Sequence, residues 1–193
     1  NTKKRKLTEK DFFSPLSVYA ISKVSAFYIC EYFKKAHNLK IFGAIFFNHE
    51  SERRTDEYVS RKITKSAVKI FLKKQKYLFL GDISAKIDWG YAKDYVIAAH
   101  KMMQLKKPDF FIIGTGKVHS IEYFVRKSFE YLGLNYKKYL RINKKLVRKI
   151  KTQTLVANPA KANRVFKFNP STNLDKLIKI MIENDLRIET DKQ

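Results

Sequence analysis

KIFGAIFF, residues 40–47, is an apolar run of the length of one strand. Isoleucine and phenylalanine favour extended backbone, and an apolar run without polar alternation is typical of a strand covered on both faces. We therefore predict a buried strand over residues 40–47. Such strands occur in parallel sheets, so the segments on either side of this run decide the fold class.

Those flanking segments, residues 17–37 and 57–75, both have the spacing of amphipathic helices. Further along, we predict strands over residues 77–80, 109–113 and 136–142, helices over residues 91–105, 120–132 and 174–186, and a helix start at Asn158-Pro159. Strands that alternate with helices in this way predict an α/β layered fold.

The composition indicates a chain that can build a real core. It has 193 residues, 45% of them hydrophobic, which suits one domain or a large fragment of one. We expect a basic tail over residues 1–11 and a partial domain over residues 12–193. Cys30 lies in an apolar helical segment, so we expect a buried structural thiol. The four histidines lack the spacing of metal ligands, and no metal site is expected.

Charge is the strongest compositional feature. There are 41 Lys and Arg against 18 Asp and Glu, a formal net charge of +23. A soluble metabolic enzyme has no need of this imbalance, which raises self-repulsion in the folded state. A polyanionic partner is the favoured explanation, and an AT-rich genome that inflates lysine is the alternative.

The basic residues concentrate in residues 131–174, a stretch without any Asp or Glu. Clustered lysine and arginine supply most sequence-independent affinity for nucleic acid. The aromatic residues between them are interpreted as core residues. The predicted RNA-binding residues are Lys137, Lys138, Arg141, Lys144, Lys145, Arg148, Lys149 and Lys151.

Tyr19 and Lys23 are four residues apart and so share one face of the first predicted helix. In short-chain dehydrogenases this pairing is catalytic, because the ammonium favours the tyrosinate that exchanges a proton with a substrate hydroxyl. By itself the pattern is weak, since Tyr123 and Lys127 have the same spacing.

The surrounding motifs are much more specific. In order along the chain they are SPLSVYAISK (residues 14–23), FNHES (47–51) followed by Arg53 and Arg54, YVSRKI (58–63), LGD (80–82) and DWGYAKDYV (88–96). In this order and at these spacings they resemble the GDP-mannose 4,6-dehydratases, which are extended short-chain dehydrogenases. The resemblance runs from about residue 7 to residue 186.

The resemblance implies a fold and a set of site residues. The expected fold is the C-terminal half of an extended short-chain dehydrogenase: a partial Rossmann-type parallel sheet with flanking helices, plus a small substrate-binding subdomain. The implied catalytic residues are Tyr19 and Lys23. The implied GDP-sugar contacts are Asn48, Val59, Lys62 and Arg148, and Arg53 and Arg54 lie near a subunit contact and a neighbouring cofactor.

Three departures from the family pattern predict an eroded site. No glycine-rich turn for cofactor phosphates is found, so we expect no cofactor on this chain alone and NADP only if a partner chain supplies the dinucleotide-binding half. Ile87 replaces the arginine that grips the diphosphate in the family. In the stretch from Asn143 to Lys151, lysine replaces two prolines and an acidic residue.

Two functional hypotheses follow. In the first, the chain is a non-catalytic, enzyme-derived component of a ribonucleoprotein such as a mitochondrial ribosome, and it binds rRNA and neighbouring proteins. The expected location is then the mitochondrion, with the cytoplasm as the alternative, and no membrane partner is expected. In the second, it is one piece of a truncated or split GDP-mannose 4,6-dehydratase that forms GDP-4-keto-6-deoxymannose. Both predict an exposed apolar flank where further strands would pair.

Overall fold

A computed structural model describes residues 5–147 and 153–191. The helices are α1 (Val18–Ala36), α2 (Val59–Phe71), α3 (Ala92–Met103), α4 (Ile121–Tyr131), α5 (Tyr136–Tyr139), α6 (Ala160–Phe166) and α7 (Leu174–Thr190), with a 3-10 turn η1 (Lys144–Leu146). The strands are β1 (Gly43–Phe46), β2 (Asn48–Glu50), β3 (Leu78–Leu80), β4 (Lys86–Ile87), β5 (Trp89–Tyr91), β6 (Phe110–Ile113), β7 (His119–Ser120) and β8 (Leu140–Ile142). None of the helices described is long and apolar enough to span a membrane.

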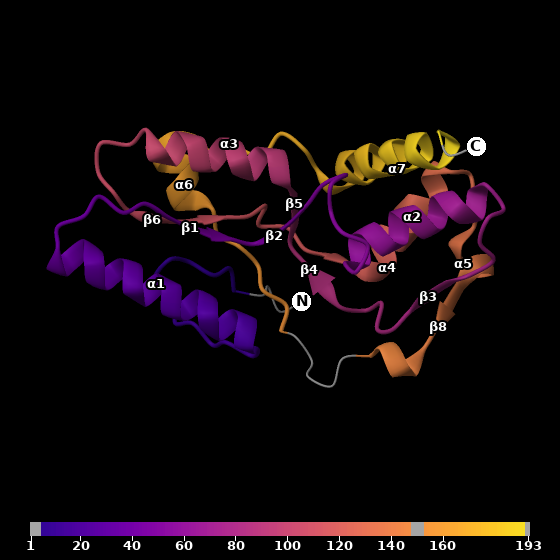
Figure 1. Cartoon of the computed structure of the whole chain (residues 1–193), viewed down its shortest axis with the longest axis horizontal. Coiled ribbons are helices and arrows are strands. Elements are labelled where there is room, and N and C mark those ends of the chain that lie inside the picture. The colour runs from indigo at the N-terminus through magenta and orange to yellow at the C-terminus, as the bar shows by residue number, and fades with distance from the viewer. Residues whose placement is uncertain (1–4, 148–152, 192–193) are drawn as a thin grey trace.

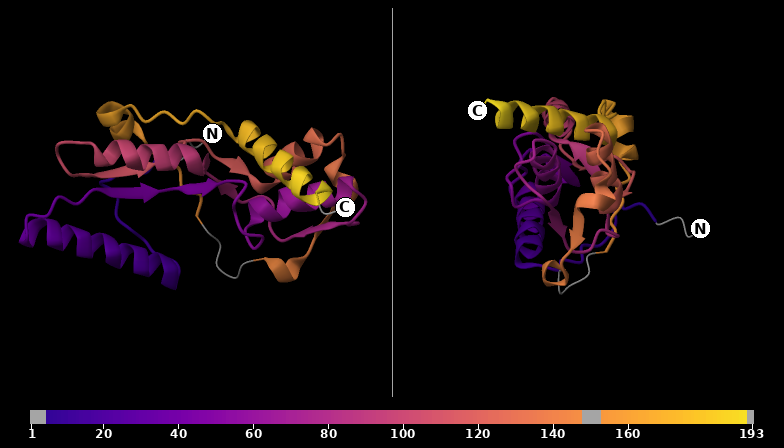
Figure 2. Two further views of the ribbon diagram at one scale, coloured as in Figure 1. Left: turned by 45° about the horizontal axis from the view of Figure 1, so that its top comes forward. Right: turned by 90° about the vertical axis from the view of Figure 1, so that its right-hand side faces the viewer.

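The elements form two lobes (Figure 1). In the sheet lobe, β1 and β6 lie between α1 on one side and α3 and α6 on the other, and Figure 2 shows the same layering from another direction. In the helical lobe, α7 packs on α2 and α4, next to α5 and the β3–β8 pair. β2 and β5 connect the two lobes.

The sheets are short and mainly parallel. β1 pairs with β6, β2 with β5 and β3 with β8, all parallel, whereas β4 and β7 are antiparallel. Parallel pairs joined through helices confirm the predicted α/β class with a partial parallel sheet.

Each lobe has its own core. In the helical lobe, fully buried side chains of α2, α4 and α7 meet, among them Ile63, Phe124 and Leu177. In the sheet lobe, Phe111 of β6 packs against Tyr95 of α3 and residues of α6. The predicted apolar face of the second helix is thus buried as expected, and the predicted helices over residues 120–132 and 174–186 also bury apolar faces.

The predicted buried strand over residues 40–47 is wrong in its burial. Phe46 is 42% exposed, because β1 pairs only with β6 within the part of the chain described. α1 has no buried residue, although Val18 and Ile29 belong to its predicted apolar face. The thiol of Cys30 is therefore only half-buried, contrary to prediction. The expected exposed apolar flank is confirmed on this side of the sheet lobe.

The described part of the predicted basic tail lies against the fold. The Leu7 amide donates to the Val156 carbonyl at 2.8 Å, and the Asn158 amide donates to the Leu7 carbonyl at 2.8 Å. Glu9 accepts a hydrogen bond from the amide of Ile112 on β6 at 2.9 Å. Residues 7–9 are therefore anchored, while the domain division itself stays a prediction.

The strand predicted over residues 136–142 is only half correct. Residues 136–139 form a helical turn, because the Asn135 side chain accepts a hydrogen bond from the Lys137 amide at 3.1 Å and caps it. Only residues 140–142 form a strand. Phe166 and Phe168 are buried, which confirms their interpretation as core residues.

Candidate functional site

The implied sugar-nucleotide residues lie where β2 leads into α2. Asn48 is exposed at the start of β2 and pairs in register with Trp89 on β5. Ile87, at the position of the family's diphosphate-binding arginine, ends β4 two residues before Trp89. Val59 and Lys62 occupy the first turn of α2, half-buried and three residues apart, so they share one face.

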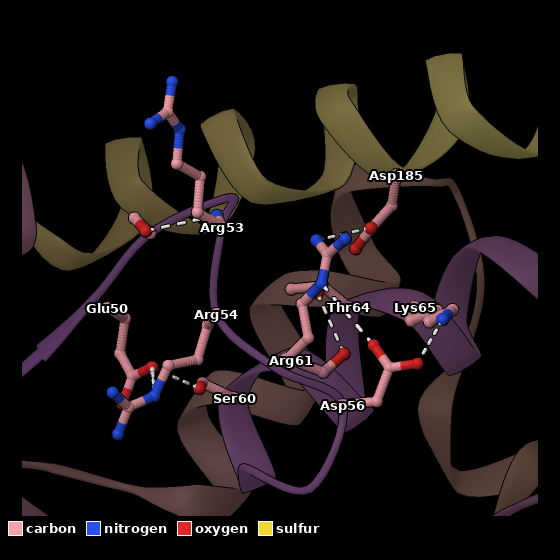
Figure 3. Close-up of polar contacts among 10 residues, drawn as sticks. Glu50, Arg53, Arg54, Asp56, Ser60, Arg61, Thr64, Lys65 and Asp185 are labelled. Atoms are coloured by element: carbon pink, nitrogen blue, oxygen red, sulfur yellow. Dashed lines mark hydrogen bonds and ion pairs between the residues drawn. The ribbon is translucent and has the colours of Figure 1, made fainter.

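The start of α2 is tied to β2 by a buried carboxylate. Glu50 is 4% exposed, and its Oε2 accepts a hydrogen bond from the Ser60 hydroxyl at 2.7 Å (Figure 3). The Nε of Arg54 lies 3.2 Å from the same oxygen. Burial raises the pKa of Glu50, and the Ser60 hydrogen bond and the Arg54 charge oppose this shift.

The two neighbouring arginines differ in their surroundings. The Arg54 guanidinium carbon lies 3.3 Å from the centroid of the Tyr58 ring, so this side chain is held both by stacking and by Glu50. Arg53 is exposed, and its side chain points away from the other labelled residues in Figure 3. Arg53 is therefore the one of the pair that can reach a ligand or another chain without breaking a contact described here.

A second buried ion pair connects α2 to α7, and sequence reasoning missed it. Nη1 of Arg61 lies 2.5 Å from Oδ1 of Asp185, and both residues are almost fully buried. Asp56 approaches Arg61 Nε at 3.9 Å and also pairs with Lys65 (Figure 3). Burial raises the pKa of Asp185, and its interactions with Thr64 and Arg61 oppose the shift.

The DWG motif has a structural role in this fold. The fully buried Asp88 carboxylate accepts hydrogen bonds from the amides of Thr115 at 3.0 Å, Gly116 at 2.9 Å and Ala157 at 3.1 Å. At Gly90, an added Cβ would lie 2.3 Å from the Tyr95 ring, so no larger residue fits. The aspartate and the glycine hold β5 against the neighbouring loops.

Tyr19 and Lys23 lie on α1, in the other lobe from α2. They share one face as predicted, with Lys23 Nζ 5.3 Å from the centroid of the Tyr19 ring. Tyr19 is 72% exposed. The pair is therefore open to solvent on the apolar flank of the sheet lobe, and this chain alone does not enclose a substrate hydroxyl there.

Five of the predicted RNA-binding residues, which we call the basic belt, lie on α5, β8 and η1 at one edge of the helical lobe (Figure 1). Lys137 and Lys138 on α5, Arg141 on β8, and Lys144 and Lys145 on η1 are all exposed. The salt bridges found among the described residues involve none of these five. Arg148, Lys149 and Lys151 lie outside the described residues.

The pairing of β3 with β8 brings aromatic rings next to this belt. Arg141 pairs in register with Phe79, which is 47% exposed, and its guanidinium carbon lies 4.1 Å from the centroid of the Tyr77 ring. These rings come from a segment distant in sequence from residues 131–174. Sequence reasoning had considered only the aromatics inside that stretch.

Comparison with known proteins gives the ancestry of the chain. The family model "GDP-mannose 4,6 dehydratase" matches residues 1–181. GDP-mannose 4,6 dehydratase 2 of Arabidopsis thaliana is 39% identical over 176 residues, covering 91% of this chain and 47% of the relative. The Homo sapiens GDP-mannose 4,6 dehydratase is 35% identical, covering 91% and 52%. The chain thus spans about half the length of the curated relatives it matches.

Solved structures match the fold at low sequence identity. RMD from Pseudomonas aeruginosa, complexed with NADPH, superposes with a TM-score of 0.86 at 15% identity and covers 93% of this chain and 60% of its own. dTDP-glucose 4,6-dehydratase from Bacillus anthracis, in complex with NAD, gives a TM-score of 0.86 at 19% identity, covering 97% and 58%. The predicted α/β architecture, a partial parallel sheet with flanking helices, is confirmed.

Proposed function

This chain belongs to the GDP-mannose 4,6-dehydratase family, and from this premise we propose that it supplies the GDP-mannose side of such an enzyme's active site. The observation that carries the proposal is the ordered start of α2. Val59 and Lys62, the residues that resemble the family's GDP-sugar contacts, lie on one face of a turn held by Glu50. The Lys62 ammonium suits a sugar nucleotide because it can pair with phosphate oxygens.

The chemistry on α1 fits the same proposal. Tyr19 and Lys23, which resemble the family's catalytic pair, share one face of α1, with Lys23 Nζ 5.3 Å from the centroid of the Tyr19 ring, and a tyrosine hydroxyl placed in this way can exchange a proton with a sugar hydroxyl. Because Tyr19 is largely exposed, the proton transfer needs a further polypeptide surface to exclude water from this face.

The nicotinamide cofactor fits these residues only in part. Lys23 is exposed and free to reach a ribose, but these 193 residues contain no glycine-rich turn to hold a pyrophosphate. We therefore propose that NADP binds only where a dinucleotide-binding half completes the fold, whether that half belongs to the same polypeptide or to another. Hydride chemistry is then the cofactor's contribution, and positioning of the sugar nucleotide is the contribution of this chain.

Ile87 leaves the proposed site without a side chain that binds the diphosphate at this position. A guanidinium forms charge-assisted hydrogen bonds of about 1.5–3 kcal/mol to phosphate, and isoleucine forms none. The Ile87→Arg variant should therefore bind GDP-mannose about ten-fold to a hundred-fold more tightly in an isothermal titration.

Val96→Arg is the matched control for this gain, because it adds the same charge at an exposed position on α3. Equal gains in the two variants, or no gain at Ile87, would refute the placement of the diphosphate beside β4.

The exposed basic belt favours a second candidate function. As a recruited, non-catalytic ribonucleoprotein component, for instance in a mitochondrial ribosome, the chain would contact rRNA phosphates through Lys137, Lys138, Arg141, Lys144 and Lys145 and would touch neighbouring proteins through its apolar flank. Support comes from the net charge of +23 and from the absence of these five residues from the salt bridges described. The exposed Phe79 ring next to Arg141 adds a surface on which an unpaired base can stack.

The two candidates differ in a measurable way. The enzyme proposal predicts GDP-mannose binding that depends on Lys62, whereas the ribonucleoprotein proposal predicts RNA binding that depends on the basic belt and falls steeply with salt. Titration of one preparation with each ligand decides between them.

A further inference from the structure

The contact between Arg61 and Asp185 is placed unusually for a stabilising ion pair. It crosses the interface between α2 and α7 at the first turn of α2, where Arg61 is 6% and Asp185 is 1% exposed. Oδ2 of Asp185 and Nε of Arg61 have no hydrogen-bond partner among the described residues. The pair is thus buried without full hydrogen-bond satisfaction.

Stability alone does not account for such a pair. Desolvating each charge costs several kcal/mol, and well-packed apolar residues in place of a buried pair are often as stabilising or more so. Elsewhere in the core shared by α2 and α7, fully buried apolar side chains such as Ile63 and Leu177 pack together. What an ion pair adds is a fixed orientation, because Nη1 of Arg61 can meet Oδ1 of Asp185 only when α2 has one particular rotation relative to α7.

The start of α2 needs that orientation from outside the helix. Its N-cap residue, Tyr58, makes no side-chain capping hydrogen bond, so the first turn lacks the usual local anchor. Two tertiary contacts take its place at consecutive residues: Ser60 donates to Glu50, and Arg61 pairs with Asp185 (Figure 3). Residues 59 and 62 lie on either side of these two anchors.

We propose that Arg61 and Asp185 are positioning residues that hold the first turn of α2 in the rotation at which Val59 and Lys62 meet the sugar nucleotide. The proposal rests on the proposed GDP-mannose site and names the contact that fixes its geometry. A helix turns by 100° per residue, so a small loss of rotational control displaces the Lys62 ammonium from a phosphate while the core stays packed. Neither residue touches the ligand.

The test compares variants that keep the core packed but remove the orienting contact. Asp185→Asn preserves the shape of one partner, and the double variant Arg61→Met with Asp185→Leu replaces both by apolar groups. Lys74→Met is the matched control, because Lys74 pairs with Glu189 of α7 beyond the other end of α2, at 3.8 Å. For each variant the melting temperature, the GDP-mannose affinity and the hydrogen exchange of the hydrogen-bonded amides of residues 62–64 are measured.

The double variant should keep a melting temperature close to that of the wild type, yet bind GDP-mannose about ten-fold more weakly. Its amides at residues 62–64 should exchange about ten-fold faster, while Lys74→Met changes neither affinity nor exchange there. If affinity and exchange stay at wild-type values in a folded double variant, the proposal is overturned. The proposal is also overturned if Asp185→Asn loses no more GDP-mannose affinity, and gains no more amide exchange, than the control Lys74→Met does.

The proposed function can fail separately. A wild-type chain that binds no GDP-mannose sinks the sugar-nucleotide role, whatever the exchange shows. If the double variant does not fold, Asp185→Asn carries the test, because slower or unchanged exchange at residues 62–64 in that variant contradicts an anchoring role.

Discussion

The substitution Asp88→Asn tests whether the DWG motif is structural. In the wild type, Oδ2 of Asp88 accepts from the amides of Gly116 and Ala157, and Oδ1 accepts from the amide and the hydroxyl of Thr115. An asparagine has only one oxygen. The asparagine side chain has two orientations, and the more favourable one puts its NH2 group where Oδ1 of Asp88 lies. The Thr115 hydroxyl can then rotate and accept a hydrogen bond from this NH2 group. The Thr115 backbone amide, however, loses its acceptor.

The magnitude follows from these contacts. The buried Thr115 amide is left without an acceptor, which costs about 1–3 kcal/mol. The amides of Gly116 and Ala157 keep an acceptor, but it is now a neutral oxygen instead of a carboxylate oxygen, which costs about 1 kcal/mol for each bond. The free energy of unfolding should therefore fall by about 4 kcal/mol. For a chain of this size, that corresponds to a melting temperature lower by roughly 8–16 °C, since each kcal/mol shifts it by about 2–4 °C.

Thermal unfolding followed by circular dichroism, at low protein concentration, measures this difference. Asp82→Asn is the control, because Asp82 is exposed and its carboxylate accepts hydrogen bonds from the amide and hydroxyl of Ser84, so a change within about 0.5 kcal/mol is expected there. Asp88→Asn protein that melts within 2 °C of the wild type would refute the reasoning.

Three further outcomes are expected. Burial raises the pKa of Glu50 above its ordinary 4.5, so the folded state binds the Glu50 proton more tightly than the unfolded state does. The free energy of unfolding should therefore fall as the pH rises from about 4.5 through the raised pKa. The Glu50→Gln variant should lack this part of the pH dependence of stability. If the basic belt binds RNA, the logarithm of the RNA-binding constant should fall with the logarithm of the salt concentration, with a slope of about −0.7 per phosphate contacted on single strands, and reversing the charge of Lys144 and Lys145 should make this slope shallower. Reversing the charge of Lys34 and Lys35, which already pair with Glu31, should leave the slope unchanged. Equal effects at both sites would mean that binding is nonspecific. The 193 residues alone should give no NADPH fluorescence change and no turnover of GDP-mannose, and turnover by this chain alone would contradict its role as one side of the site.

Local signals in the sequence were enough for most of the elements. Ser120, the first residue of the predicted helix over residues 120–132, is of a type that favours the N-cap position, and its side chain accepts a hydrogen bond from the Tyr123 amide at 3.0 Å. Gly133 directly follows that predicted helix and has a positive φ of 68°, a conformation that favours glycine just after a helix. The turn at residues 136–139 was missed because the capping signal of Asn135 competes with strand alternation in the residues that follow it.

The sites were predicted where a motif is contiguous and missed where partners are distant. Lys62 and Arg54 lie inside short family motifs, so the resemblance located them. Asp185 is 124 positions from Arg61, and nothing in either segment marks the two as partners; the only signal was a charged residue next to the apolar face of the predicted helix. The exposure of β1 was equally hidden, because an apolar strand does not reveal whether a neighbouring strand covers it.

Isothermal titration of GDP-mannose into the wild-type chain and its Lys62→Ala variant tests the central claim most directly. The claim is that the first turn of α2 forms the sugar-nucleotide side of a dehydratase site. It predicts saturable binding by the wild type, weakened at least ten-fold when the Lys62 ammonium is removed, with the melting temperature unchanged because Lys62 is only half-buried. Absence of saturable binding, or binding of equal strength in both proteins, would contradict it.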